Sequence, residues 1–457
     1  MSEHMPLDLQ RSQFPGRTGA PNRLSSIGAV FFAVTGTLIA TSIVNIGSSG
    51  VPVFYLAFLI PVIASAFSVN SERPYSRLSR VWVPVVAVGI ALIVTTMLQL
   101  VTIPIKDTGS EVMHLVSRLC FLVYFVIAQT WLRDETLQKT LIWLRRLLIV
   151  ACAYGVYQIV AKFLGWPLFL DWLRNNRSFY IYDYDMGGWV GIIRATSIYA
   201  EPSQATIPIL VLFMLNLRIK SSSMSTFAGW LTLVLFTLAT FSRGVWATLL
   251  VAIAASLLFR SVKLCALVET KRLALTAVVL VLLLVLPVWG FIRANSNDGT
   301  DDLSAQTRSG GIVLGVHMIQ DAPILGFGWN SFDDVAQHYA AVPLDVDADI
   351  DFSIIHNTVI SDMQQAGLSG FVLAALPFIV LIGWSTAPTW MTFCTLASFL
   401  VAAELGDIGY SSLTWLWLAI LINMKSAAAG PPASRTEVAS GKHFYKPHRS
   451  GTLHSAS

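Results

Sequence analysis

Long hydrophobic blocks alternate with short polar segments along most of the chain. Read against the length of about 20 residues that crosses a bilayer core, the pattern predicts twelve helical spans. They cover residues 26–46, 51–69, 81–104, 112–131, 141–164, 204–217, 225–240, 245–259, 273–292, 366–386, 389–403 and 409–424. Helices satisfy the backbone hydrogen bonds of such runs in lipid. We therefore expect an all-α integral membrane protein with about 12 transmembrane helices.

Two of the connecting segments are much longer than the others. One is an aromatic-rich loop at 165–203, and the larger one, at 293–365, carries a candidate catalytic motif. The rest divides into transmembrane groups at 26–164, 204–292 and 366–424, with polar tails at 1–25 and 425–457. Loops of this size usually carry function or secondary structure of their own. In the larger loop, apolar residues at helical spacing predict a helix over 309–320 that lies on the membrane.

The composition excludes a soluble protein. The chain of 457 residues is 55% hydrophobic and only 12% charged, about half the charge content of soluble domains. So few charged side chains could not cover so much apolar surface in water. The four cysteines form no disulfide framework or metal-binding spacing.

The basic residues predict the orientation of the spans. With the N-terminus in the cytoplasm, 21 of the 30 lysines and arginines fall in inner segments or helix ends, and Arg118 lies within a span. The eight on the outer side are Lys106, Lys162, Arg174, Arg177, Arg194, Arg243, Arg293 and Arg308. This inside-positive bias predicts that both termini are cytoplasmic and that both long loops lie on the outer face.

Four charged residues near the outer ends of spans are candidates for function. Arg194 and Glu201 flank a segment that enters a span, where an unpaired charge costs a few kcal/mol. Arg243 stands alone in a tight turn between two spans. The structural alternatives are a snorkelled arginine, a capping glutamate and a helix-end anchor. Arg118 lies about 9 Å into its span, where it requires either a partner or a water-filled cavity. The sequence does not choose between the two.

The larger loop is acidic around its arginines and ends in a histidine. Residues 293–355 contain ten aspartates and only Arg293 and Arg308 as basic residues. The alternating aspartates of 345–351 could hold a hard cation if they formed a strand, but a solvated acidic loop is the commoner explanation. His356 and Asn357 follow where the chain re-enters the membrane. An imidazole there can accept a proton at neutral pH, although a lone histidine is more often structural.

The order of several motifs resembles the O-antigen ligase and O-antigen/exopolysaccharide polymerase superfamily of bacterial inner-membrane glycosyltransferases. The matching segments are RATSIYAEPSQA, FSRG, TRSGGIVLGVHMIQDAPILGFGWNSF and HNTVISDMQQAGLSG. The main match covers about 290–382, and weaker marks extend it back to about residue 190. Two departures from the family pattern are an aliphatic run at 312–314 in place of a common tryptophan, and Ile360 in place of a usual leucine. Neither removes a reactive group.

The resemblance implies transfer of a glycan from undecaprenyl pyrophosphate, on the periplasmic face of the inner membrane, without a metal or other cofactor. The acceptor would be a sugar hydroxyl on a second lipid-linked glycan or on lipid A–core. Arg194, Arg243 and Arg308 would bind the pyrophosphate, because guanidinium groups offer bidentate donors to phosphate oxygens. His356 would take the acceptor proton, Glu201 would assist, and Arg118 and Asn357 are further candidates. Membrane lipids and a chain-length regulator are the expected partners, and nucleic acid is not.

Three functions remain open at this point. The AEPS at 200–203 is more typical of polymerases of repeat units than of ligases, so polymerase is the leading expectation and ligase the alternative. A transporter of lipid-linked glycans is a further alternative, but it would show broken helices, repeat symmetry and a site at the bilayer midplane. Ionisable residues are scarce within the spans and the long loops lie on one face, which favours an enzyme.

Overall fold

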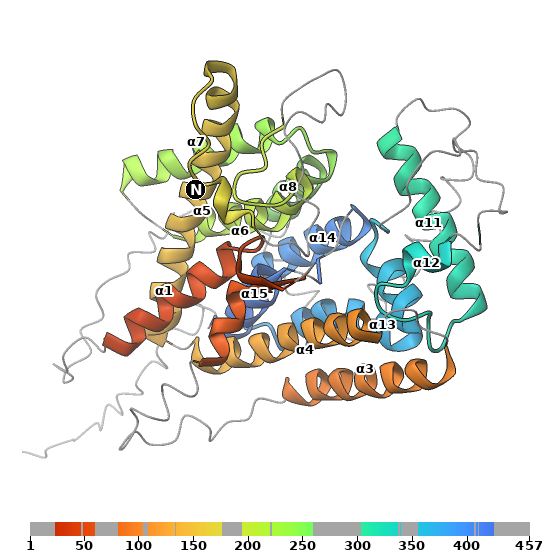
Figure 1. Cartoon of the computed structure of the whole chain (residues 1–457). Coiled ribbons are helices and arrows are strands. Elements are labelled where there is room, and N and C mark those ends of the chain that lie inside the picture. Colours follow the sequence, from red (N-terminus) through yellow and green to blue (C-terminus); the bar gives the residue numbers. More distant parts are fainter. Residues whose placement is uncertain are drawn as a thin grey trace, which may run out of the picture.

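The computed structural model describes residues 23–46, 49–59, 81–103, 108–132, 134–175, 194–219, 222–258, 303–336, 339, 355–405, 408–409 and 411–424. Within these ranges the chain is mostly helical, as expected (Figure 1). The helices are α1 (Arg23–Thr37), α3 (Trp82–Thr102), α4 (Thr108–Trp131), α5 (Asp134–Leu164), α6 (Thr206–Arg218), α7 (Ser223–Ala239), α8 (Arg243–Leu258), α11 (Leu303–Asp321), α12 (Phe332–Ala336), α13 (Thr358–Trp384), α14 (Thr389–Leu405) and α15 (Ser412–Asn423). The span expected at 273–292 and the aspartates of 345–351 lie outside the described residues.

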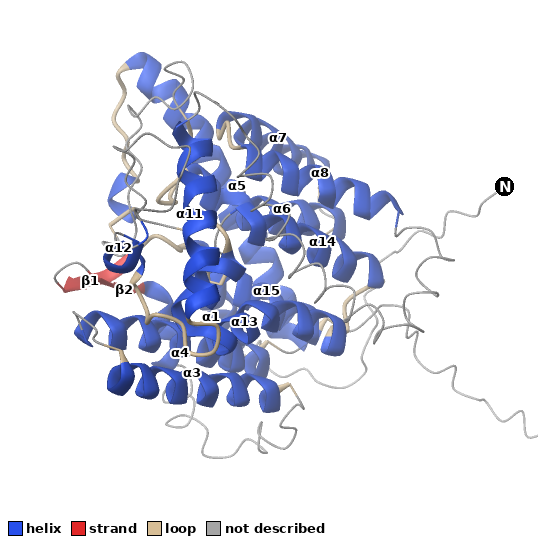
Figure 2. Cartoon of the chain, turned by 90° about the vertical axis from the view of Figure 1, so that its right-hand side faces the viewer, coloured by secondary structure: helices blue, strands red, loops and turns tan. Residues whose placement is uncertain are grey.

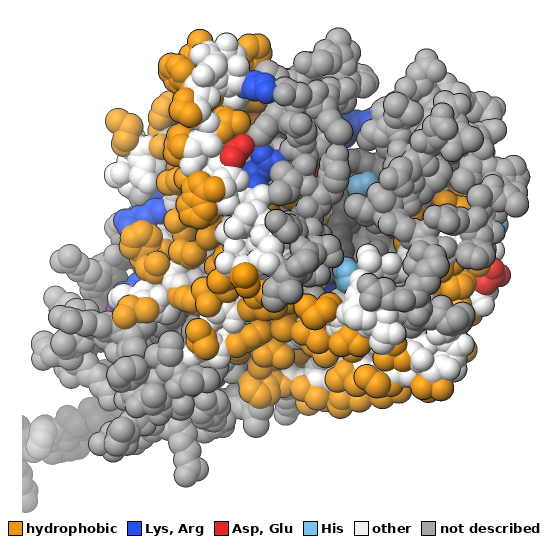
Figure 3. Space-filling view, in the orientation of Figure 1, with side chains coloured by type: hydrophobic (Ala, Val, Ile, Leu, Met, Phe, Trp, Pro, Cys, Tyr) orange, Lys and Arg blue, Asp and Glu red, His pale blue; other side chains and the backbone are white. Residues whose placement is uncertain are grey.

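Four of the described helices are long and apolar enough to cross a membrane. They are α3, α4, α5 and α13, and α1, α7, α8, α14 and α15 are shorter apolar helices. Hydrophobic side chains cover much of the face shown in Figure 3, and on α3 the exposed ones recur along one side of the helix from Val83 to Val101. Such a surface is suited to lipid. The total of about 12 spans and their orientation stay predictions.

The expectation of one continuous helix over 26–46 is wrong. Helix α1 ends at Thr37, and the chain then forms an antiparallel hairpin of β1 (Ser42–Ile46) and β2 (Ser49–Pro52), followed by the short 3₁₀ helix η1 (Val53–Phe58). The β-branched side chains of β1 favour extended backbone. The hairpin lies at the edge of the helical body (Figure 2), so the fold is not purely α.

Helix α15 is buried along its whole length and forms the centre of the helical body. All residues from Ser412 to Ile422 are buried, and α15 packs against α4, α1 and α13. Outside it, α3 lies beside α4, α5 beside α1, and α8 beside α14 (Figure 1). A short apolar helix without an exposed face is stabilised by packing rather than by contact with lipid, so the length rule for spans does not apply to it.

The helix expected over 309–320 is present as α11, from Leu303 to Asp321. It packs across the start of α13, which begins at Thr358, before the span expected at 366–386. The start of α13 therefore lies inside the segment that the sequence analysis assigned to the larger loop. Whether α11 lies on a membrane surface stays a prediction.

Candidate functional site

Helices α8 and α14 run antiparallel, and two side-chain contacts fix how they align. The Cys394 thiol donates to the Ala252 carbonyl oxygen at 3.5 Å, and the Ser398 hydroxyl donates to the Thr248 carbonyl oxygen at 3.5 Å. Four residues forward along α14 thus correspond to four residues back along α8.

This alignment brings two charged residues to the same end of the helix pair. Glu404 lies six residues beyond Ser398, and Ser242 lies six residues before Thr248. Glu404 therefore stands level with the beginning of α8, where Arg243 is the first helical residue. Glu404 is not among the residues expected from the sequence, although it is the only acidic residue of α14. An ionisable residue near the end of an apolar helix is the sequence feature that could have identified Glu404 as a candidate.

Arg194 is attached to the turn between α7 and α8. Its Nε donates to the Thr240 carbonyl oxygen at 3.2 Å, and the neighbouring Ala195 N–H donates to the Ala239 carbonyl oxygen at 2.9 Å. Because Arg243 begins α8 three residues after Thr240, the two arginines lie on either side of one turn. Arg243 is exposed.

The segment after Arg194 is held rigidly against α5. The Gln158 amide accepts a hydrogen bond from the Ser197 N–H at 2.7 Å and donates one to the Ser197 carbonyl oxygen at 2.8 Å. Ser197 has a φ of +59°, in the left-handed region that side chains other than glycine rarely adopt. Its hydroxyl donates to the Ala151 carbonyl oxygen at 2.5 Å. Nearby, burial raises the pKa of the Tyr199 hydroxyl well above its usual range, so that hydroxyl stays protonated.

Glu201 lies at the N-cap position of η3 (Pro202–Ala205) but does not cap it. Its carboxylate accepts a hydrogen bond from the Ser203 hydroxyl instead. Because η3 packs against α8, Glu201 lies near the helix that begins at Arg243. The contacts of Glu201 therefore do not indicate a simple capping role.

His356 directly precedes the first turn of α13, and that turn is tied to α14. The Asn357 side chain caps α13 by accepting a hydrogen bond from the Ile360 N–H at 3.0 Å. The other end of the same amide donates to Glu404 Oε2 at 2.9 Å. His356 is half-buried. The bond to Glu404 brings the start of α13 to the same end of the α8–α14 pair as Arg243.

Helix α13 is broken eight residues after it starts. Ala366 and Gly367 have non-helical backbone angles. The turn at 322–331 fills the break. Its bonds run from the Phe327 N–H to the Gln364 carbonyl (2.9 Å), from the Gly328 N–H to the Gln365 carbonyl (3.0 Å) and from the Leu368 N–H to the Ile324 carbonyl (3.1 Å). Gln99 of α3 donates to the Leu325 and Gln365 carbonyls at 2.5 and 2.7 Å.

Two motif glycines permit this close approach. Gly367 has a φ of +55°, and a Cβ there would stand 2.2 Å from the Ile324 carbonyl oxygen. Gly326 has a φ of +73°, and a Cβ there would stand 2.6 Å from the Gln365 carbonyl oxygen. No side chain fits at either position without a shift of backbone. These glycines of the PILGFG and QQAGLSG segments therefore have a structural role, which is to lock the turn against the broken helix.

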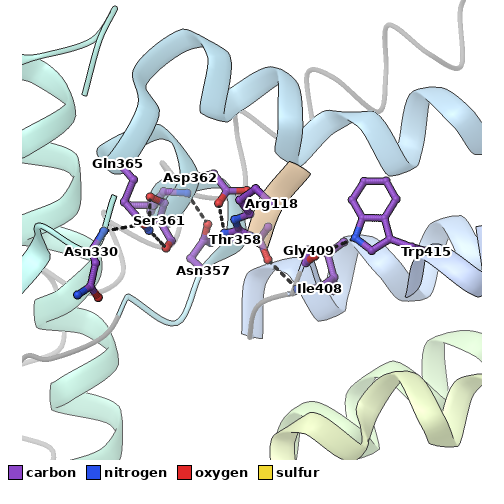
Figure 4. Close-up of polar contacts among 11 residues, drawn as sticks. Arg118, Asn330, Asn357, Thr358, Ser361, Asp362, Gln365, Ile408, Gly409 and Trp415 are labelled. Carbon is purple, nitrogen blue, oxygen red and sulfur yellow. Dashed lines mark hydrogen bonds and ion pairs between the residues drawn. The ribbon is translucent and has the colours of Figure 1, made fainter. Parts of the chain in front are cut away.

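Arg118 has a partner, which settles the choice that the sequence left open. Its Nη2 lies 2.5 Å from Asp362 Oδ1, and the two side chains are only 2% and 1% exposed. The guanidinium also lies over the Trp329 ring, 5.7 Å from the ring centroid, and the Trp329 indole donates to the Thr96 hydroxyl at 2.9 Å. Figure 4 shows the ion pair next to Asn357 and Thr358. Arg118 is thus engaged inside the protein.

The structure gives only the backbone position of Arg308, in the first part of α11. Seven residues later, a Cβ on Gly315 would stand 2.6 Å from a methyl of Ile360 and 2.9 Å from one of Ile355. Helix α11 therefore crosses the chain on both sides of His356. Seven residues are about two helical turns, so Arg308 and Gly315 share a face of α11. The Arg308 side chain lies outside the described residues.

The described residues thus gather Arg194, Arg243 and the His356–Asn357 segment around one end of the α8–α14 pair, with Glu404 added. Arg118 is not part of this group, and it reaches the first turns of α13 from α4 through its ion pair with Asp362. In the described part of the chain, no three His, Cys, Asp or Glu side chains form a group that could hold a metal ion.

Residues 227–375 match the family model described as O-Antigen ligase. No curated protein matches the chain. The matched segment includes Arg243, Arg308, His356 and Asn357, whereas Arg194 precedes it. It confirms, over 149 of the 457 residues, the resemblance to the O-antigen ligase and polymerase superfamily. The members of that family are glycosyltransferase-like membrane enzymes.

Proposed function

We propose that this chain, whose residues 227–375 carry an O-antigen ligase domain, transfers a glycan from undecaprenyl pyrophosphate to a sugar hydroxyl at the periplasmic face of the inner membrane. The observation that carries the proposal is the meeting of Arg194, Arg243 and the His356–Asn357 segment at one end of the α8–α14 pair. Two guanidinium groups and one imidazole there come from three segments that are far apart in the sequence.

The chemistry of the transfer suits these groups. The acceptor oxygen attacks the anomeric carbon while the bond to the pyrophosphate breaks, and the bonding electrons leave with the pyrophosphate. The negative charge that develops on the leaving group needs cations, which Arg194, Arg243 and Arg308 supply as bidentate donors. His356 takes the proton of the acceptor hydroxyl, which contributes about 10² to 10⁴-fold to a rate. Glu201 orients the acceptor or assists His356.

Polymerisation of O-antigen or exopolysaccharide repeat units remains our leading assignment, supported by the AEPS segment at 200–203. Ligation of a finished glycan to lipid A–core is the second candidate, favoured by the description of the matching family. Transport of a lipid-linked glycan is less well supported. The break in α13, which a transporter would use for its substrate, is filled here by hydrogen bonds from the turn at 322–331.

The proposal is tested by complementing a deletion strain with His356→Ala and Arg243→Ala and separating the glycans by length. Both variants should fail to restore transfer while remaining in the membrane at the wild-type level. Arg146→Ala is the matched control, because Arg146 is an arginine on α5 that stacks on the Trp143 ring, 5.1 Å from its centroid, away from the site. It should complement fully.

The same gel separates the two enzymatic candidates. A strain without a polymerase makes single repeats on the acceptor, whereas a strain without a ligase accumulates long polymer on the carrier lipid. Glycans of full length from both His356→Ala and Arg243→Ala would overturn the catalytic assignment.

A further inference from the structure

The Arg118–Asp362 pair joins two segments that lie 244 residues apart in the sequence. Arg118 belongs to α4 and Asp362 to α13, and both side chains are almost completely buried. Removing two charges from water costs several kcal/mol for each ion, and a good ion pair only returns that cost. Hydrophobic residues of similar size would usually fill such a position without loss of stability. A gain in stability therefore does not explain why a pair of charges occupies it.

Asp362 lies in the middle of a short, separate piece of α13. This piece, Thr358–Gln365, begins at the Asn357 cap and ends at the break at Ala366–Gly367. A helix of two turns is not stable by itself in isolation. Its place is therefore set by contacts with the surrounding elements rather than by continuity with the rest of α13.

Contacts with three other segments hold this piece. At its end, Gln364 and Gln365 accept backbone hydrogen bonds from the turn at 322–331. At its start, the Thr358 hydroxyl accepts a hydrogen bond from the Ile408 N–H at 3.1 Å, beyond the end of α14. Between these ends, Arg118 holds Asp362 from the side of α4 (Figure 4). Because Asp362 lies halfway along the piece, the ion pair is one of the contacts that limit how far the piece can turn about its own axis.

Arg118 itself has little freedom. The Trp329 ring covers its guanidinium, and the bond from the Trp329 indole to Thr96 of α3 holds that ring in place. A charged group held in this way defines a direction, because a guanidinium bonds a carboxylate in a narrow range of geometries. An apolar contact between α4 and α13 at the same position would allow the two helices to slide and rotate against each other.

We propose that Arg118 and Asp362 are positioning residues, which set the rotation of the first two turns of α13 and thereby the direction of the His356 imidazole. This inference rests on the proposed function, since it assigns His356 the role of accepting the proton. Neither residue touches substrate. They act through His356 and Asn357, which lie six and five residues before Asp362.

The test separates orientation from stability by comparing three variants in detergent-purified full-length protein, with the repeat unit on undecaprenyl pyrophosphate as donor. Arg118→Met removes the ion-pair partner of the buried Asp362 carboxylate, so the protein level should fall. Arg118→Met/Asp362→Leu restores an apolar fit and should restore the protein level. In that double variant, kcat per folded molecule should still be at least tenfold below wild type, with a change of less than twofold in KM for the donor. Arg118→Lys keeps a positive charge beside Asp362 but not the geometry of the guanidinium, so it should keep the protein level and recover kcat only in part.

A wild-type kcat in the Arg118→Met/Asp362→Leu variant would overturn the positioning role and leave the pair as a structural contact only. A rise in KM with an unchanged kcat would also overturn it, because the pair would then act on donor binding. His356→Ala is measured in parallel. Full transfer by His356→Ala would count against the proposed function itself, whereas loss of transfer there together with a wild-type double variant would count against the positioning role alone.

Discussion

Asn357 and Glu404 share a hydrogen bond of 2.9 Å, from the amide nitrogen of Asn357 to a carboxylate oxygen of Glu404. The bond joins the first turn of α13 to the last turn of α14. Because α14 runs antiparallel to α8, it also brings His356 to the end where Arg194 and Arg243 lie. One side-chain contact thus connects the histidine of the larger loop with the arginines of the two earlier motifs.

The Asn357–Glu404 hydrogen bond can be tested by placing a negative charge at position 357. Asn357→Asp keeps an N-cap acceptor but places two carboxylates at hydrogen-bond distance, and such a pair repels when both are ionised. We expect the variant to lose at least about tenfold in transfer at neutral pH, which corresponds to about 1.4 kcal/mol. Adding Glu404→Gln supplies a donor from the other side and should regain most of the loss. Glycan length and protein level in complemented membranes report both effects.

If Asn357→Asp alone complements like wild type, the bond does not matter for the site. If the double variant is no better than Asn357→Asp, the loss arises from position 357 itself rather than from its contact with Glu404. Glu404→Gln by itself is the control, because an amide at 404 can still accept the hydrogen bond from Asn357. It should retain most of the activity.

The break in α13 is expected to tolerate no side chain. Gly367→Ala requires a left-handed residue other than glycine, which costs about 1–2 kcal/mol, and places a Cβ 2.2 Å from the Ile324 carbonyl oxygen. We expect the purified protein to lose at least about 2 kcal/mol of stability, seen as a lower thermal midpoint. Gly383→Ala is the matched control in the same helix. Its Cβ would meet nothing within 4 Å, so stability should change by no more than about 1 kcal/mol, in the favourable direction. Equal midpoints for the two variants would contradict the locking role of the break.

The Gln158 side chain should control the order of the segment that carries Arg194. Gln158→Leu removes both hydrogen bonds to Ser197, and each buried group left unpaired costs about 1–3 kcal/mol. We expect faster amide exchange in peptides covering 194–205 and reduced transfer. Val160→Ala, at an exposed position on the same helix, should change neither. Unchanged exchange at 194–205 in Gln158→Leu would show that other contacts hold this segment.

The Trp329–Thr96 bond should show strong coupling in a double-mutant cycle. Thr96→Val leaves the buried indole N–H without its acceptor, at a cost of about 1–3 kcal/mol. Trp329→Phe removes that N–H, so the double variant should be less destabilised than the sum of the two single variants. Thermal midpoints of the four proteins measure the coupling. Strict additivity would mean that the indole bond contributes little to holding the ring over Arg118.

Hydrophobic pattern alone predicts most of the described helices. It indicates α3, α4, α6, α7, α8, α14 and α15 close to their observed ends, because a long apolar run has few alternatives to a helix. Helix α5, expected from residue 141, begins earlier, at Asp134. The pattern was wrong at 26–46, where β-branched residues at the end of an apolar stretch form the first strand of a hairpin. Apolar length alone does not distinguish a helix from a strand.

The candidate site, like the fold, could be predicted from the sequence only in part. The residue types at 194, 243, 308 and 356 became candidates for phosphate binding and proton transfer only through the resemblance to the family, because a helix-end arginine or a lone histidine is also commonly structural. Their assembly around the start of α13 depends on Glu404, whose meaning comes only from its contact with Asn357. The sequence also presented the PILGFG segment as part of a motif without indicating that it locks a broken helix.

The sequence by itself determined that this chain is a mostly helical membrane protein, and it indicated candidate functional residues near the expected ends of spans, since apolar runs and isolated charges have strong, local preferences. The tertiary structure decided that Arg118 belongs with Asp362 and that Asn357 belongs with Glu404. Both pairs join residues from different helices, and the partner of a buried polar group is chosen by how those helices pack, which no local pattern records.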